Sequence, residues 1–306
     1  IEGTPVKIIS EGAFRYGKFK HIKLPEHLMW IDDYAFADNA YLEEFGTTDS
    51  LMGYGNGVFL NCTALSHVEL SSQTIVIFNS MFENTPMLDS LLIPSNVTHI
   101  MNYAFSKSGI ENMNFPAKLQ YIGDYAFSES SIHHANIPAG VMVIGEGAFY
   151  SCPNLSEAYI PNSLIAIGDK AYANNPLLTE FDLAESHMFF LLYDGGLYTY
   201  DSIDPSSDYN LIAYPAGRVD SNVDIHTNTS LVSTNVFEGA SHIQTVTMPN
   251  SLIGDFGLIF KETTGLQNII LISNTRPQVL DEIDGVLYSS DFTVLYKYPE
   301  AKTNTS

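Results

Sequence analysis

The side chains that could do chemistry are few and scattered. His21, His67 and His134 could serve as zinc ligands, which must lie about 2.1 Å from the ion. They fall in non-adjacent segments of a repeat described below, so we expect them to lie roughly 10 Å or more apart. No Gly-x-Ser-x-Gly elbow, Cys-His motif or phosphate-binding glycine loop occurs. We therefore expect no metal site, no cofactor, no catalytic residue and no enzyme activity.

A loop rich in carboxylates is a second candidate for metal binding. Asp201, Asp204 and Asp208 could offer oxygen ligands to calcium. Their spacing matches no EF-hand loop, and Pro205 with the two serines that follow it is typical of turn chemistry. We predict a solvated loop here.

The composition narrows the class of partner. The net charge is −22, from 35 acidic against 13 basic residues. A phosphate backbone needs a surface of Lys and Arg, so nucleic acid is a poor partner, and anionic membrane surfaces are disfavoured for the same reason. The hydrophobic content of 45% is enough to build a core, and no apolar run approaches the length of a membrane span.

The positions of these residues follow from a repeat of 22 or 23 residues. An aromatic residue marks each period, and the same beat resumes late in the chain at Phe237 and Phe260. Apolar residues also recur five and two residues before a reference column that includes Leu24, Leu70 and Ile160. Such a period is the signature of stacked structural repeats. The first aromatic column is Phe14, Phe36, Phe59, Phe82, Phe105, Phe127, Phe149 and Tyr172.

Each period predicts two short segments. The alternation of buried positions around the reference column indicates a short strand, and a proline such as Pro94 or Pro161 ends it. An isoleucine column such as Ile100 begins the second segment. Two residues later comes an acceptor column, interpreted as caps for the exposed N–H groups of a helical turn. Its members are Glu11, Asp33, Asn56, Asn79, Asn102, Asp124, Glu146 and Asp169.

Stacking of these coils fixes the expected place of the two cysteines. One coil cannot bury its own apolar face, so its neighbours must supply the core. Strands of a parallel ladder lie about 4.8 Å apart. Cys62 and Cys152 share one column four coils apart, or about 19 Å, whereas a disulfide needs Cα atoms within about 7 Å. We predict two buried corner thiols and no intrachain disulfide.

The pattern resembles the BspA-like leucine-rich repeats of bacterial surface proteins. The motifs that carry the resemblance are Leu-x-x-hydrophobic-x-hydrophobic-Pro, as in residues 155–161, and Ile-Gly-Asp-x-Ala-Phe, as in residues 122–127. It implies a leucine-rich-repeat solenoid, α/β and horseshoe-like but mostly β, with short helical turns and a parallel strand ladder. It also implies a secreted or cell-surface protein of host-associated bacteria, with a role in adhesion or ligand binding and no catalytic residues to carry over.

The repeat predicts one solenoid domain over residues 1–306. Regular coils cover 1–183, a longer hairpin-bearing coil covers 184–220, regular coils return over 221–272, and a second hairpin-bearing coil covers 273–306. The Asp-Gly pairs at Asp194 and Asp284 suggest the hairpin turns, and the longer loop of the first hairpin is placed at 202–208. The chain begins and ends in mid-repeat, so the last coil is expected to be truncated or to carry an unusual cap.

The face made by the repeated strands is where solenoids bind their ligands. Its outward positions are least charged in the fourth to seventh coils, and Asn and Tyr are adaptable contact residues. We predict binding of an extracellular protein or glycan to a monomer, while a structural spacer or stalk that displays another domain is the alternative function. The predicted contact residues are Leu92, Asn112, Asn114, His134, Asn136 and Tyr159.

Overall fold

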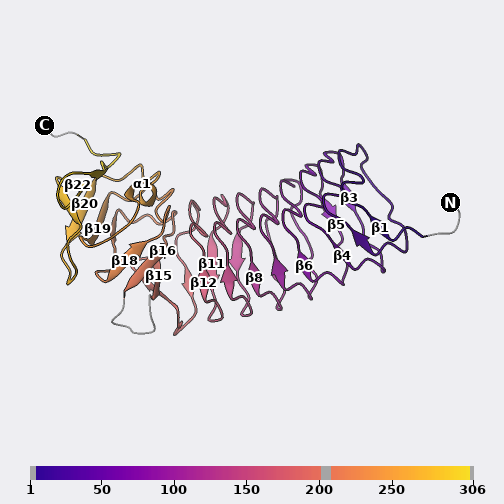
Figure 1. Ribbon diagram of the computed structural model, residues 1–306, viewed down its shortest axis with the longest axis horizontal. Coiled ribbons are helices and arrows are strands. Elements are labelled where there is room, and N and C mark those ends of the chain that lie inside the picture. Colours follow the sequence, from indigo (N-terminus) through magenta and orange to yellow (C-terminus); the bar gives the residue numbers. More distant parts are fainter. Residues whose placement is uncertain (1–4, 201–207, 304–306) are drawn as a thin grey trace. The chain divides into compact units, whose positions relative to one another are not determined.

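Short parallel strands joined by tight turns build the protein. The computed structural model describes residues 5–200 and 208–303, and these divide into two compact units. The first unit holds residues 5–155 and 163–168, and the second holds 156–162, 169–200 and 208–303. Figure 1 shows the successive coils of the first unit side by side, in indigo to magenta. The predicted solenoid with a parallel ladder is confirmed.

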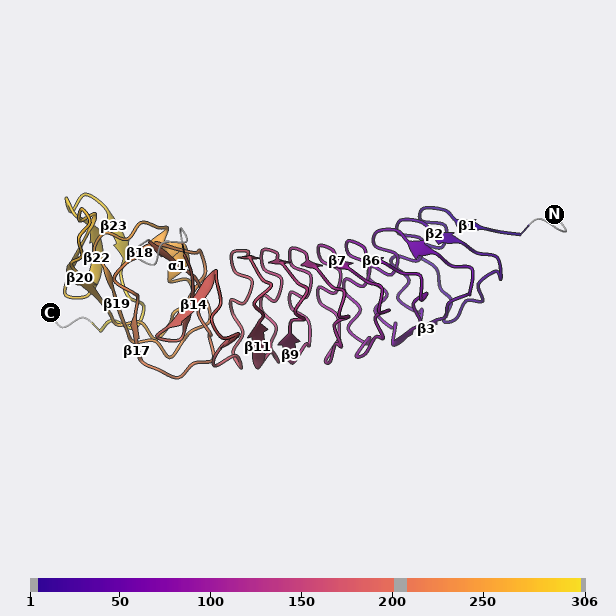
Figure 2. The ribbon, with the colours of Figure 1, turned by 90° about the horizontal axis from the view of Figure 1, so that it is seen from below.

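The first unit carries strands on two faces of its coils. Its first face bears short strands just before the reference column, and its second face bears strands that end in the isoleucine column. Figure 2 shows β6 and β7 of the second face adjacent to each other. Strands of the first face are β3 (Glu44–Phe45), β5 (His67–Val68) and β9 (His134–Asn136). Strands of the second face are β1 (Ile8–Ile9), β2 (Trp30–Ile31), β4 (Gly53–Tyr54), β6 (Val76–Ile77), β7 (His99–Ile100), β8 (Tyr121–Ile122), β10 (Val143–Ile144) and β12 (Ala166–Ile167).

The second unit combines parallel coils with two antiparallel insertions. Turns at Asp194-Gly195 and Asp284-Gly285, all with positive φ, join the first two strands of each insertion. The parallel strands are β11 (Glu157–Ile160), β13 (Asp182–Leu183), β17 (Asn222–Asp224), β18 (Thr229–Val232), β19 (Thr245–Pro249) and β20 (Asn268–Ile272), and one helical turn, α1 (Phe256–Ile259), is present. The insertions are β14 (Phe190–Tyr193), β15 (Gly196–Tyr200) and β16 (Tyr209–Ala213), then β21 (Leu280–Ile283), β22 (Val286–Ser289) and β23 (Leu295–Lys297).

The turns of the first unit follow one backbone rule. The residue two before and the residue two after each aromatic have positive φ, as at Tyr103 (59°) and Lys107 (57°) around Phe105. This alternation points every second N–H toward the next coil: Tyr103, Phe105 and Lys107 donate to the carbonyls of Asp124, Ala126 and Ser128. Left-handed backbone costs a non-glycine residue about 1–2 kcal/mol, so these hydrogen bonds must offset that cost in every coil.

The acceptor column links coils rather than capping helices. Asp33 Oδ1 accepts from the backbone N–H of Asn56 at 2.7 Å, and Asn102 Oδ1 accepts from that of Asp124 at 3.0 Å. The side-chain amide of Asn79 donates to Asn56 Oδ1 at 2.9 Å. The prediction of acceptors for exposed N–H groups was therefore right in its chemistry, but the N–H groups belong to the neighbouring coil and no helix follows them.

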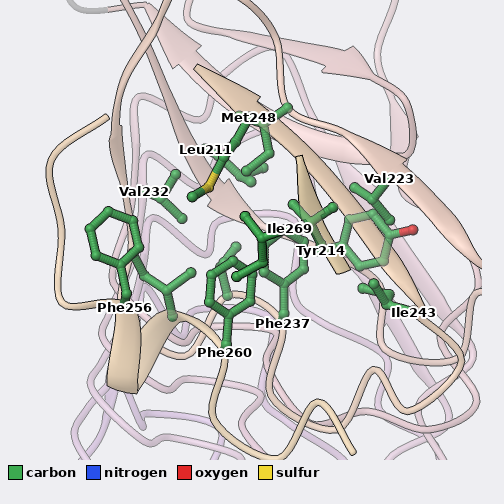
Figure 3. Close-up of a cluster of buried hydrophobic side chains, with 14 of the residues drawn as sticks. Leu211, Tyr214, Val223, Val232, Phe237, Ile243, Met248, Phe256, Phe260 and Ile269 are labelled. Atoms are coloured by element: carbon green, nitrogen blue, oxygen red, sulfur yellow. The ribbon is translucent and has the colours of Figure 1, made fainter. Parts of the chain in front are cut away.

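Buried aromatic rings form a continuous stack through the first unit. The rings of Phe82, Phe105 and Phe127 are nearly parallel, with centroids 5.2–5.3 Å apart, and all three are fully buried. Phe14 heads the stack and is 37% exposed. In the second unit, Phe237 and Phe260 repeat the stack within a cluster that includes Tyr214, Val232 and Ile269 (Figure 3).

The two cysteines occupy the buried corners that the repeat predicted. Both thiols are inaccessible, and they donate to carbonyls of the preceding coil: Cys62 to Phe36 at 3.2 Å and Cys152 to Phe127 at 3.0 Å. Burial disfavours the thiolate and raises the pKa of each to about 12. They are structural residues of the corner.

The aromatic stack predicts unequal costs for truncating its rings. Phe105→Ala removes a fully buried ring with stacked neighbours on both sides, so we expect a loss of about 3–5 kcal/mol in the free energy of unfolding. Phe14→Ala, at the exposed end, should cost less than half as much. Urea unfolding followed by circular dichroism measures both. Equal losses for the two variants would contradict a continuous packed spine.

Burial of the cysteines predicts slow alkylation. At pH 8 the folded protein should react with iodoacetamide roughly 10³-fold more slowly than the urea-unfolded chain, because only the thiolate reacts. The folded pKa is raised, so the stability that the buried thiols contribute is present below the unfolded pKa of about 9 and is lost as pH rises toward 12. Mass spectrometry counts the alkylated cysteines, and fast native labelling would show that the corners open.

Candidate functional site

Three of the predicted contact residues lie together on the first face. Leu92 is 83% exposed, although it directly follows the buried Leu91. Asn112 and Asn114 are exposed on either side of the buried Met113. The backbone joins the two coils through an isolated parallel bridge between Ser90 and Asn112. Alternation along each strand therefore presents these side chains on one surface, as the sequence predicted.

These residues line a cavity of about 730 Å³. Buried Val68 and Leu91 contribute its apolar surface, and the exposed Leu92 adds to it. Polar side chains complete it. The lining residues are Thr47, His67, Val68, Glu69, Leu70, Ser90, Leu91, Leu92, Asn112 and Asn114.

The other three predicted residues stand apart from this cavity. His134 is half-buried and Asn136 is exposed, both on β9 of the first unit. Tyr159 belongs to β11 of the second unit, where it pairs with Asp182 of β13. A contact role for these three residues stays a prediction.

The cavity lies at a break in the ladder of the first face. Within the part of the chain that the structure describes, β5 pairs with β3, and no parallel rung joins β5 to the coil of Ser90. An edge of this kind is suited to receive hydrogen bonds from a ligand.

Departures from the repeat accompany this break. Tyr54 occupies the isoleucine column, and Thr48 and Ser71 stand where most coils have proline. The buried Tyr54 hydroxyl accepts from the backbone N–H of Ser71 at 3.2 Å, and the Ser71 hydroxyl donates to the Leu51 carbonyl. Burial raises the pKa of Tyr54, and the Ser71 hydrogen bond opposes this. These contacts replace the proline corner of the regular coils.

Sequence reasoning missed Thr47, His67, Glu69 and Ser90 as site residues. Their signal was present, because Thr47 is the polar residue in an otherwise apolar reference column and the adjacent Pro column is lost at the same coils. Positions where a repeat loses its usual residue types are expected to be functional or strained sites.

The polar part of the cavity contains one acidic residue, and two more precede its lining residues in the sequence. Glu69 lines it, and Asp89 and Glu111 directly precede the lining residues Ser90 and Asn112. His67 Nε2 lies 3.9 Å from Glu69 Oε1, with both side chains more than 60% exposed, so the pair contributes little stability. The site presents an apolar anchor beside negative charge.

Metal chemistry finds no support in the described residues. No group of three His, Cys, Asp or Glu side chains among them is arranged to hold a metal ion. His21 instead lies 3.7 Å from Glu44. Asp201 and Asp204 of the suggested calcium loop, and residues 202–207 of that loop, fall outside the described residues, while Asp208 pairs with Arg276. Across residues 5–200 and 208–303, no helix has both the length and the apolar character to span a bilayer.

Comparisons with known proteins agree with the repeat. A model described as "BspA type Leucine rich repeat region" matches in six copies, over residues 3–111, 77–190 and 220–281. No curated protein matches the chain.

Solved structures share the architecture. A leucine rich cell surface protein of Faecalibacterium prausnitzii A2-165 is 25% identical with a TM-score of 0.70, and the match covers 87% of this chain and 70% of that one. A leucine-rich repeat protein of Bacteroides ovatus ATCC 8483 is 22% identical with a TM-score of 0.56, over 87% and 76% of the two chains. One from Eubacterium ventriosum ATCC 27560 is 17% identical with a TM-score of 0.54, over 76% and 61%. The last two show the fold alone.

The corner beside the cavity predicts the effect of one hydroxyl. Tyr54→Phe leaves the buried Ser71 N–H without its acceptor, so we expect a loss of about 1–3 kcal/mol in the free energy of unfolding. Tyr103→Phe is the matched control, because Tyr103 is 41% exposed and keeps its ring stack on Tyr125. Thermal and urea unfolding compare the two variants, and equal stability would show that the Tyr54 hydroxyl does not hold this corner.

Proposed function

The chain belongs to the family of BspA-type leucine-rich repeat proteins, and from this we propose that it is a non-catalytic binding protein. We place it outside the cell or on the cell surface, where it recognises a host or other extracellular macromolecule through the cavity of the first face. The description of the Faecalibacterium prausnitzii relative as a cell surface protein supports that location.

One observation carries the proposal: Leu92 is 83% exposed inside a cavity of about 730 Å³. In the adjacent coils, the same position holds Glu69 and Asn114. An exposed leucine costs solubility and offers nothing to the core, which already has Leu91 and Ile93. It is suited to contact an apolar group of a ligand, because exposed apolar surface rimmed by polar residues marks interaction sites.

The surroundings of Leu92 define the chemistry of the ligand. Asn112 and Asn114 offer amide donors and acceptors, which suit the backbone of a protein segment. Glu69, Asp89 and Glu111 favour a ligand that carries Lys or Arg next to its apolar side chain. We therefore favour a protein ligand over a glycan. His134 and Asn136 on β9 would extend the contact along the first unit, and Tyr159 is a separate candidate on the second.

Binding to arrays of extracellular-matrix proteins and of glycans tests the proposal. With a ligand in hand, Leu92→Ala should weaken binding at least about tenfold, which corresponds to about 1.4 kcal/mol. Asn112→Ala and Asn114→Ala should each weaken it less. The melting temperature should stay within about 2 °C, since surface substitutions rarely change stability by more than 0.5 kcal/mol.

Met87→Ala is the matched control, because Met87 is an apolar residue of the first unit that is 59% exposed and does not line the cavity. Equal affinities for Leu92→Ala, Met87→Ala and the unchanged protein would place the ligand elsewhere. A glycan as the ligand would overturn the preference for protein. Absence of any ligand on both arrays would favour the spacer or stalk function.

A further inference from the structure

The second face of the first unit exposes an apolar side chain directly before the strand in five of its coils, at Met29, Met52, Ile75, Met142 and Ile165. The exposed fractions are 58% for Met52, 59% for Ile75, 46% for Met142 and 51% for Ile165. The core does not require these side chains, since it already receives neighbouring residues such as Leu51, Val141 and Leu164. Strand propensity does not explain the methionines at this position either, because strands favour β-branched and aromatic residues.

This surface also excludes negative charge. We call it the acid-free stripe, and it consists of four successive residues from each of seven coils. The stripe has no Asp or Glu, although the whole chain has 35. Its basic groups are Lys118, His27 and His99. It comprises residues 27–30, 50–53, 73–76, 96–99, 118–121, 140–143 and 163–166.

From the second to the seventh coil, the outward column of the stripe has the same order of apolar and polar residues in both directions, and Met29 of the first coil lies outside this symmetric set. Met52 and Ile75 precede two polar residues, Thr98 and Gln120, and a second apolar pair, Met142 and Ile165, follows them. A two-fold interface requires such self-complementarity, because residue i meets residue j and j meets i.

We propose that a second copy of this chain docks on the acid-free stripe, face to face and with the order of its coils reversed. A chain of net charge −22 repels its own copy, so two copies approach most easily through a surface without carboxylates. The stripe is such a surface, and burial of its exposed apolar side chains stabilises the pair of copies. This proposal is independent of the ligand site on the first face.

The pattern sets one register for the pair. With the two-fold axis between the fourth and fifth coils, Ile75 meets Met142 of the second copy and Met52 meets Ile165 of the second copy. Thr98 meets Gln120 of the second copy at the centre. Lys118 meets Asn96 of the second copy. Within its own chain, Lys118 Nζ donates to Asn96 Oδ1 at 2.9 Å.

The size of the stripe implies a weak complex. The six coils that the register pairs, at about 4.8 Å each, and four residues at about 3.3 Å give roughly 380 Å² per copy. Stable interfaces bury about 800 Å² per partner. We therefore expect association that depends on concentration, with the predicted monomer in dilute solution and dimers at high concentration.

Sedimentation velocity over a concentration series tests both the surface and the register. Ile75→Lys and Met142→Glu should each raise the dissociation constant at least about tenfold, because each places an unpaired charge against an apolar surface. The double variant should regain association, since the two new charges meet across the axis as a pair. Ile253→Glu is the control, at the same repeat position in the second unit and 65% exposed.

Each outcome of the sedimentation series either supports or overturns the proposed dimer. The proposal stands if both single variants weaken the dimer, the double variant recovers it, and Ile253→Glu leaves it unchanged, with unaltered circular dichroism throughout. A protein that stays monomeric up to millimolar concentration overturns it. So does a dimer that the single variants leave intact, or one that the double variant fails to recover.

Discussion

Every coil of this protein depends on hydrogen bonds that it cannot make by itself. In each turn of the first unit, the residues two before and two after the aromatic adopt positive φ, and the N–H groups of these two residues and of the aromatic point toward the next coil. An isolated coil would leave these groups unpaired and its phenylalanine exposed on both sides. Stacking satisfies the N–H groups and buries the ring in the same step, so backbone pairing and core packing are a single requirement.

This coupling explains why the acceptor column accommodates both Asp and Asn. The column needs an oxygen that reaches the N–H group of the neighbouring coil, as Asp33 and Asp124 show. Asparagine adds an amide that continues the chain of contacts, as between Asn79 and Asn56. Part of the acidity of the protein therefore has a structural cause.

The places where the repeat fails are as informative as the repeat. Tyr54 and Ser71 replace an isoleucine and a proline, and their hydrogen bond builds a different corner. On the first face, among the described residues, no parallel pairing joins β5 to the next coil, and the cavity lies at this gap in the ladder. On the second face, the lack of carboxylates in the acid-free stripe and the exposure of its methionines follow no rule of the core. The two proposals of this protein's function thus use separate surfaces of one unit.

The sequence by itself determined the solenoid, its parallel ladder, the buried corners at Cys62 and Cys152 and the exposure of Leu92. These follow from residue types that recur at a fixed period, and a period determines the surroundings of every column. Tertiary structure alone decided which coil receives each hydrogen bond from the acceptor column, because one residue spacing is compatible with capping inside a coil and with bonding between coils. It also decided that Leu92, Asn112 and Asn114 share a cavity with Thr47 and Glu69, while His134 and Asn136 do not. A cavity depends on where neighbouring coils separate, and that separation arises from side chains that break the period.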